Sequence, residues 1–305
     1  ELALKNKLVD TIKEVFINYS FEQLETPEFE KSVNIGSFLA EDESNPMSDV
    51  FSFVNEKESL TLRYDLSAPL ARFCAENFRD LVFPYKRFAY GNVFRQEKAD
   101  SARYRAFGQL DADIIGDANQ SQADAEICNI IGESFKKIGL SKDQFTINVS
   151  NKKILQGLIN ELKIEEDKQY RVLKSIDKLD RLGTKGVEEL LKRGRKDQSG
   201  AFTKGCELSD SQASEIINFL NLKGISDLKA NLKNPFSLEG INELEELFEV
   251  LSYGNNQDSV KIDVTKIRGL SYYTGFLVET NLNFKVTNAK GKEINIGSVA
   301  SGGRY

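Results

Sequence analysis

The sequence predicts an α+β fold, in which an antiparallel sheet is flanked by helices and interrupted by an inserted all-helical domain. Two observations support this prediction. Strand-like patterns occur at residues 85–115 and return at residue 260. Between them, residues 153–254 have an almost wholly helical pattern that is rich in Leu, Ile, Lys and Glu. A helical block between two strand-rich stretches is typical of a domain inserted into an α+β core.

The first predicted elements are a helix, a strand and a second helix. Residues 4–18 place apolar side chains at helical spacing on one face. Residues 21–27 alternate like a strand that ends at a proline. Residues 67–78 predict the second helix, because Ser67 suits the N-cap and Pro69 suits the first turn.

A hairpin, a helix and a short strand come next. Residues 85–94 and 105–115 are the predicted arms of the hairpin, and residues 98–102 form its polar link. Residues 121–138 predict a helix that ends at a glycine. Residues 145–149 alternate like a short strand.

The remaining pattern gives the helical block and the final strands. The clearest helices of the block are expected at residues 187–196, 209–222 and 241–251. Strands are expected at residues 260–264 and 272–281, followed by a hairpin around residues 288–291. Gly302 and Gly303 beside a charged residue suit a tight turn into further structure, so we expect a fragment of a longer protein. The predicted domains are residues 1–152, 153–254 and 255–305.

Composition excludes several kinds of site. The 305 residues include no histidine, which excludes Ser-His-Asp and Cys-His catalysis and the usual His-rich zinc sites. Cys74, Cys128 and Cys206 are odd in number and far apart, so we expect reduced, mostly buried thiols. No apolar run approaches the roughly 20 residues that cross a bilayer, and no secretory pattern opens the chain. We therefore expect a cytoplasmic protein with no membrane segment and no metal held by its own side chains.

The central hairpin carries the most informative side chains. If its arms pair antiparallel, alternate residues share a face, namely Phe107, Gln109, Asp111 and Asp113. Three guanidiniums lie toward the loop, those of Arg95, Arg103 and Arg105. A guanidinium grips phosphate oxygens, whereas amides and carboxylates suit an ammonium or an imidazole N–H. The strip fits a triphosphate beside an amino acid, although an exposed hairpin whose charges face water would have similar residues.

Residues 94–113 resemble motif 2 of class II aminoacyl-tRNA synthetases, and their continuation resembles the histidyl-tRNA synthetases in particular. The resemblance implies that Arg95 holds the α-phosphate of ATP and the carboxylate of histidine. It also implies that Glu97 meets the adenine amino group and that Arg103 reaches the γ-phosphate. Phe107 would stack on adenine.

The same resemblance assigns a histidine pocket. Gln109 and Asp113 would line it, and we expect Gln109 nearer the α-amino group and Asp113 nearer the imidazole. Residues 61–70 also resemble this family, which implies that Asp65 binds the α-ammonium of the substrate. Asp65 also suits a second role, since a carboxylate at a helix entry is favoured by the helix dipole.

Residues 267–276 resemble the first of two histidine-specific motifs of this family. The resemblance implies that Arg268 stabilises the reacting α-phosphate from across the active site and also contacts histidine. It implies that Tyr272 and Tyr273 wall the imidazole pocket. Ser271 stands where the family usually has an acidic residue.

Weaker resemblances occur elsewhere. Residues 298–305 resemble the second histidine motif, and the helix followed by residues 21–27 resembles motif 1, which forms the dimer interface in this class. Residues 176–180 and 194–197 resemble the insertion domain of some bacterial members. A basic cluster lies near the latter, formed by Lys192, Arg193, Arg195, Lys196 and Lys204. This cluster suits a solvated helix end, or less favourably the acceptor arm of a tRNA.

The resemblance implies a histidine–tRNA ligase that uses ATP with Mg²⁺, forms histidyl-adenylate and loads tRNA(His) as a homodimer. Neither motif 3 nor an anticodon-binding domain is recognisable in the chain. One alternative is the histidine-sensing regulatory subunit of ATP phosphoribosyltransferase, and another is a synthetase-like domain of a stress kinase. The retention of Arg95, Arg103 and Arg268 favours the synthetase, because a sensor needs no complete triphosphate clamp.

Overall fold

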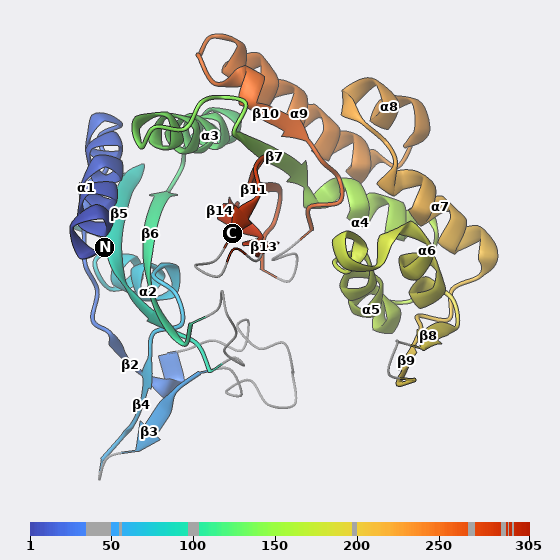
Figure 1. Cartoon of the computed structure of the whole chain (residues 1–305), viewed down its shortest axis with the longest axis horizontal. Coiled ribbons are helices and arrows are strands. Elements are labelled where there is room, and N and C mark those ends of the chain that lie inside the picture. Colours follow the sequence, from blue (N-terminus) through green and yellow to red (C-terminus); the bar gives the residue numbers. More distant parts are fainter. Residues whose placement is uncertain are drawn as a thin grey trace. The chain divides into compact units, whose positions relative to one another are not determined.

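The computed structural model describes residues 1–34, 50–54, 57–96, 104–196, 200–267, 272–287, 291, 293–294 and 296–305. The chain divides into two compact units (Figure 1). Unit 1 comprises Glu1–Ala123, Glu133–Leu140 and Lys285–Ile296. Unit 2 comprises Asp124–Gly132, Ser141–Phe284 and Gly297–Tyr305.

Unit 1 contains a three-stranded sheet with a helix against one face. The strands, in the order in which they pair, are β1 (Glu22–Gln23), β5 (Tyr85–Phe94) and β6 (Ala106–Ile115). β5 and β6 are antiparallel over their full length, whereas β1 is parallel to β5. Helix α1 (Leu2–Asn18) lies beside β5 (Figure 1), where the rings of Phe16 and Phe88 have centroids 5.4 Å apart. Burial of such aromatic pairs fixes the helix on this face of the sheet.

The other elements of unit 1 are short. They are β2 (Phe29–Lys31), a 3-10 helix (Ser32–Asn34), β3 (Ser52–Val54), β4 (Ser59–Leu62), α2 (Ser67–Glu76), β12 (Val286–Thr287) and β13 (Glu293–Ile294). β4 pairs antiparallel with both β2 and β3, and β12 pairs with β13. Just after β4, the buried Arg63 donates hydrogen bonds of 2.7 Å to the carbonyl oxygens of Thr26 and Asn92. These bonds fasten the start of the segment that leads to α2.

Helix α3 (Gln120–Lys137) contributes residues to both units. It begins at Asn119, whose side chain accepts a hydrogen bond from the backbone N–H of Gln122. Such an N-cap satisfies a backbone donor that has no partner within the helix.

Unit 2 contains a four-stranded sheet. In the order in which they pair, its strands are β10 (Val260–Ile262), β7 (Phe145–Asn151), β11 (Phe276–Leu282) and β14 (Ser298–Gly303). β10 is parallel to β7, and the other two pairs are antiparallel. Ile147 and Val149 of β7, one of the two inner strands, are fully buried.

The rest of unit 2 is mostly helical. Its elements are α4 (Lys152–Glu161), α5 (Glu166–Ile176), α6 (Leu179–Leu191), β8 (Gly194–Lys196), β9 (Phe202–Lys204), α7 (Asp210–Leu220), α8 (Gly224–Asn231), α9 (Pro235–Ser252) and a 3-10 helix (Gln257–Ser259). α4 and α9 pack closely because Gly157 of α4 and Gly240 of α9 each face the other helix. A Cβ on Gly157 would lie 2.2 Å from Ser237 Oγ, and a Cβ on Gly240 would lie 2.9 Å from Ile154 Cγ1.

Most predicted elements are confirmed, with four differences, the first of which is that predicted strand 272–281 begins only at Phe276. Of the predicted strand 21–27, only the two residues of β1 (Glu22–Gln23) form a strand. Predicted helix 187–196 is wrong after Leu191, because residues 194–196 belong to a short hairpin within the otherwise helical block. The turn predicted at Gly302 and Gly303 is also wrong, since both glycines lie in β14. The predicted domain boundaries remain a prediction.

The cysteines and the helices bear on two further expectations. Cys74, Cys128 and Cys206 are all buried and unbridged, as predicted. Burial raises the pKa of each of these thiols, which keeps them protonated and unreactive. In the part of the chain that the structure describes, no helix has both the length and the apolar character that a membrane span requires.

Candidate active site

One face of the β5–β6 pair carries the predicted hairpin residues. The register sets Phe107 opposite Val93, Gln109 opposite Gly91, Asp111 opposite Ala89 and Asp113 opposite Arg87. Because alternate residues of a strand share a face, these side chains line one strip, as the sequence predicted. The floor of the strip is a small apolar cluster of Leu66, Ala89 and Val93, against which Phe107 packs.

Arg95 follows β5 directly and lies at one end of this strip. Its guanidinium carbon is 4.4 Å from the centroid of the Tyr64 ring and 5.2 Å from that of Phe107. Its Nε donates to the carbonyl oxygen of Tyr64 at 3.3 Å. Within the described residues Arg95 forms no ion pair, and its charge acts on the nearby carboxyls of Asp65 and Asp111.

Asp65 lies next to this guanidinium, at the entry to α2. Its Oδ1 accepts a hydrogen bond of 2.9 Å from the backbone N–H of Ala68, so the helix-entry role expected for it is confirmed. Burial raises the pKa of Asp65, although that hydrogen bond and the charge of Arg95 oppose the change. A half-buried carboxylate with one oxygen engaged is suited to an ammonium group.

Gln109 has an unmet hydrogen-bonding capacity. Its side-chain oxygen is buried and has no partner among the described residues. A buried acceptor without a donor is costly, typically by about 1–3 kcal/mol. A ligand that brings an N–H group to this position would remove that cost.

Asp113 forms an ion pair with Arg87, a residue that the sequence did not identify as part of the site. Arg87 is fully buried, and its Nη1 donates to Asp113 Oδ2 at 3.2 Å. The other donors of Arg87 go to the carbonyl oxygens of Leu24 and Leu66, at 3.2 and 3.4 Å. The hydroxyl of Ser67 lies 3.4 Å from Asp113 Oδ1. Any imidazole contact of Asp113 would therefore share a carboxylate already bound by Arg87.

Asp111, between Gln109 and Asp113, was likewise not selected as a site residue. Burial, followed by the nearby charge of Asp113, raises the pKa of Asp111 from 3.8 to about 7, while Arg87 and Arg95 act in the opposite direction. One feature of the sequence could have identified both Arg87 and Asp111, namely a charged side chain at an inward-facing position of a strand.

The tyrosine pair lies in unit 2. The ring centroids of Tyr272 and Tyr273 are 4.4 Å apart, and Tyr272 is exposed. Gly303 permits this arrangement, because a Cβ there would lie 2.7 Å from the Tyr273 ring. Gly303, in the segment that resembles the second histidine motif, thus leaves space for the ring of Tyr273, in the segment that resembles the first.

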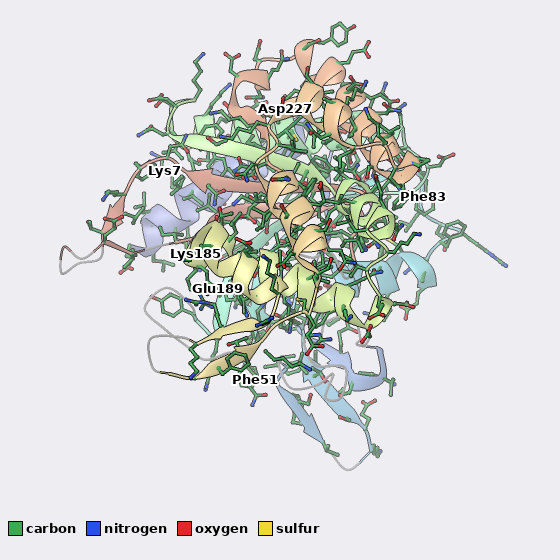
Figure 2. The ribbon with its side chains drawn as sticks, turned by 90° about the vertical axis from the view of Figure 1, so that its right-hand side faces the viewer. Lys7, Phe51, Phe83, Lys185, Glu189 and Asp227 are labelled. Carbon is green, nitrogen blue, oxygen red and sulfur yellow. The ribbon has the colours of Figure 1, made fainter. Side chains whose placement is uncertain are left out.

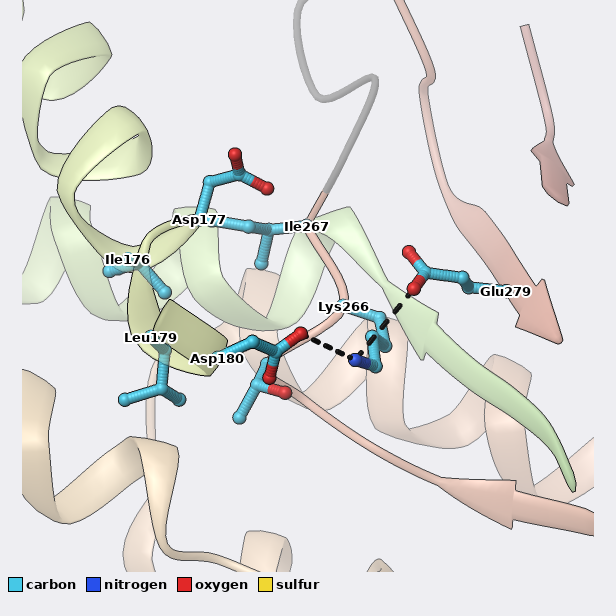
Figure 3. A pocket seen from close by; sticks show the side chains of 8 residues that line it. Ile176, Asp177, Leu179, Asp180, Lys266, Ile267 and Glu279 are labelled. Carbon is cyan, nitrogen blue, oxygen red and sulfur yellow. Dashed lines mark hydrogen bonds and ion pairs between the residues drawn. The ribbon is translucent and has the colours of Figure 1, made fainter. Parts of the chain in front are cut away.

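Three predicted site residues, Glu97, Arg103 and Arg268, lie outside the described residues, as does Ser271. The chain just before Arg268 is described. Figure 3 shows a small polar pocket there, lined by Ile176, Asp177, Leu179, Asp180, Thr265, Lys266, Ile267 and Glu279. In it, Lys266 Nζ lies 3.4 Å from an oxygen of Asp180 and 3.7 Å from one of Glu279. The segment leading to Arg268 is therefore anchored to α6 and β11.

The basic cluster near the β8–β9 hairpin is largely offset by acidic side chains. Figure 2 shows Glu189 on α6 near this hairpin, where it pairs with Arg195 at 3.4 Å. Lys192 pairs with Glu188 and Asp210, and Lys204 pairs with Glu207. Such pairing at a solvated surface agrees with the more favoured of the two readings of the cluster.

Comparison with known proteins agrees with this geometry. The family model for histidyl-tRNA synthetase matches residues 1–305. The histidine–tRNA ligases of Pelagibacter ubique and Bartonella bacilliformis are 58% and 43% identical to the whole chain, which spans 66% and 64% of their lengths. The chain thus spans just under two thirds of these curated relatives.

Solved structures give the same result for the fold. A histidyl-tRNA synthetase from Nostoc superposes with a TM-score of 0.75 at 28% identity, covering 92% of this chain and 62% of that one. An ATP phosphoribosyltransferase regulatory subunit/histidyl-tRNA synthetase from Bacillus halodurans has a TM-score of 0.76 at 24% identity, covering 92% and 69%, and shares the fold. The predicted α+β class is confirmed, and the chain belongs to the histidyl-tRNA synthetase family.

Proposed function

We propose that this chain is the catalytic part of a histidine–tRNA ligase. The proposed reaction has two steps. The carboxylate of histidine attacks the α-phosphorus of ATP, which releases pyrophosphate and forms histidyl-adenylate. The 3′ end of tRNA(His) then attacks the adenylate carbonyl. We place this activity in the cytoplasm.

The observation that carries the proposal is the strip on β5–β6. The guanidinium of Arg95 lies against the rings of Tyr64 and Phe107 and forms no ion pair within the described residues. Asp65 lies next to this guanidinium, and the side-chain oxygen of Gln109, which has no partner among the described residues, lies on the same face of the β5–β6 pair. A cation with oxygen acceptors beside it is a polarity that suits an α-phosphate next to an α-ammonium group.

The roles follow from that polarity. Arg95 would bind the α-phosphate and the substrate carboxylate, and Phe107 would stack on adenine. Asp65 and Gln109 would bind the α-ammonium group. Tyr272, Tyr273 and Asp113 would enclose the imidazole. Arg268 would stabilise the α-phosphate from the opposite side, with Glu97 at the adenine amino group and Arg103 at the γ-phosphate.

Mg²⁺ would accompany ATP. Among the described residues, no group of three or more His, Cys, Asp or Glu side chains is arranged to hold a metal ion. We expect the ion to be carried mainly by phosphate oxygens, which is how Mg²⁺ usually binds with nucleotides. Its contribution would be to neutralise the outer phosphates.

A homodimer is the proposed assembly. The helix and strand that resemble motif 1 are α1 and β1, and α1 exposes Leu4 and Leu8, which are 71% and 40% accessible. Leucines one turn apart form an apolar stripe that a second copy would cover. Light scattering should give twice the mass of one chain, and the mass of a single chain would contradict the dimer.

Histidine-dependent ATP–pyrophosphate exchange tests the activity directly. We expect Arg95→Ala to lower kcat/KM for exchange by about 10² to 10³, the usual effect of losing one donor to transition-state charge. Arg79→Ala is the matched control, because Arg79 is an exposed arginine of the same unit. Histidine binding without exchange would instead favour the regulatory-subunit alternative. Exchange that is equally fast in Arg95→Ala and Arg79→Ala would refute the role of Arg95.

A further inference from the structure

A largely buried ionic cluster in unit 2 surrounds Arg304. Its Nη1 donates to Glu243 on α9 at 2.9 Å, and its Nη2 forms an ion pair with Asp124 on α3. The side chains of Arg304, Asp124 and Glu243 are only 18%, 11% and 14% exposed. A guanidinium can satisfy two carboxylates at once because its donors lie in a planar fork. Arg304 thus joins two helices that are far apart in sequence.

Glu243 is itself fixed by other donors. Asn151, at the end of β7, donates to it at 2.7 Å, and Lys153 on α4 forms an ion pair with it. Burial acts against the charged carboxylate, but the hydrogen bonds from Lys153 and Asn151 and the charge of Arg304 hold the pKa of Glu243 below its usual value. Glu243 therefore stays ionised and in one place.

The backbone of Arg304 holds the turn that carries the tyrosine pair. The N–H of Thr274 donates to the carbonyl oxygen of Arg304 at 2.6 Å, and the Thr274 hydroxyl lies 3.2 Å from the same oxygen. The N–H of Arg304 donates to the carbonyl oxygen of Phe276 at 2.9 Å. The guanidinium also lies against this turn, because a Cβ on Gly275 would come within 2.9 Å of Arg304 Nη1.

We propose that Arg304, clamped by Glu243 and Asp124, is a positioning residue for the histidine pocket. The backbone and side chain of Arg304 both contact the turn that follows Tyr272 and Tyr273. The clamp therefore limits how far these rings move. This inference rests on the proposed function in one respect, the assignment of the tyrosines to the imidazole. It adds that helix α9 sets the position of one pocket wall.

The test compares two carboxylates of α9. Glu239 and Glu243 both pair with Lys153, but only Glu243 contacts Arg304. We expect Glu243→Gln to raise the Kd for histidine about tenfold, the effect of one weakened charge-assisted hydrogen bond. The matched control Glu239→Gln should leave that Kd unchanged. The Kd for ATP should change in neither variant, because the contacts proposed for ATP are at Arg95 and Phe107.

Calorimetry measures both affinities, and exchange kinetics give the KM for histidine and kcat. A merely structural bridge would lower the thermal midpoint and the active fraction, and hence kcat, while the Kd for histidine stayed the same. Equal histidine Kd values in Glu243→Gln and Glu239→Gln would overturn the inference, as would parallel losses of histidine and ATP affinity. Arg304→Lys, which keeps the charge but loses the fork, should weaken histidine binding in the same direction.

The two proposals fail in different ways. If the wild-type protein binds histidine but does not catalyse exchange, the ligase proposal fails while the comparison of Kd values still decides the role of Arg304. If exchange is normal and Glu243→Gln has the histidine KM of the control, the positioning role fails alone. A wild-type protein that does not bind histidine would overturn both.

Discussion

Asp111 offers the most quantitative prediction, the effect of Asp111→Asn on stability at different pH values. The side chain lies on the inner strip of β6, beside Asp113 and opposite the small Ala89. Arg87 is already committed to Asp113 and to backbone carbonyl groups. The charged form of Asp111 is therefore poorly compensated.

The magnitude follows from the change in pKa. In the folded protein the pKa of Asp111 is about 7, against an ordinary value of 3.8. The folded state thus binds the proton more tightly than the unfolded chain does, so the free energy of unfolding falls as the pH rises between these two values. At about 1.4 kcal/mol for each pKa unit, the full penalty above that window is about 4 kcal/mol. The neutral amide of Asp111→Asn removes this penalty.

Urea unfolding at pH 5 and pH 8 provides the assay. We expect Asp111→Asn to be more stable than wild type at pH 8 by about 2 to 4 kcal/mol, and by clearly less at pH 5. Asp117→Asn, which changes an exposed aspartate just beyond β6, is the control and should show no such difference. If the advantage of Asp111→Asn were the same at both pH values, the reasoning from burial would be refuted.

Two further predictions concern glycines beside large side chains. In Gly91→Ala the new Cβ would lie 2.3 Å from Nη2 of the buried Arg63. We therefore expect urea unfolding to show a loss of about 2 kcal/mol in the free energy of unfolding. An unchanged free energy of unfolding would contradict this close approach. In Gly303→Ala the new Cβ would lie 2.7 Å from the Tyr273 ring and would displace it. We expect calorimetry to show that the affinity for histidine falls by about tenfold. An unchanged affinity would show that Tyr273 does not belong to the histidine pocket.

The sequence predicted elements whose stability depends on local pattern. The two arms of the central hairpin have strong alternation, and their predicted limits match β5 and β6 closely. The predicted strand 21–27 is shorter because the Leu24 carbonyl accepts a hydrogen bond from the side chain of Arg87 and not from a backbone N–H group of β5. That carbonyl lies 63 residues from its partner, a separation that periodicity does not encode.

The end of α6 has a similar cause. The sequence from 192 to 196 continues a helical pattern, yet the carbonyl oxygens of Leu190 and Leu191 accept from the N–H groups of Cys206 and Leu208. Gly194, with a φ of 104°, then turns the chain into β8. Contacts with a later segment therefore end the helix before its local pattern does.

In the candidate site, the sequence identified side chains by their resemblance to a motif but did not show their electrostatic partners. Arg95 lies 5.2 Å from the centroid of the Phe107 ring, so two of the side chains named by the motif are neighbours. Arg87 was missed because its importance depends on complete burial and on Asp113, 26 residues away. Asp111 was not identified for the same reason, because its raised pKa comes from burial and from its position beside Asp113, which the residue type alone does not show.

The discontinuity of unit 1 has a consequence for synthesis on the ribosome. Its β12–β13 hairpin, within Lys285–Ile296, is made long after Glu1–Ala123. Native contacts between such distant stretches form slowly, because a long loop must close first. During translation, unit 1 is complete only after this later segment has been made. A nascent polypeptide halted before Lys285 would thus hold an incomplete unit 1, a state open to chaperone binding or proteolysis.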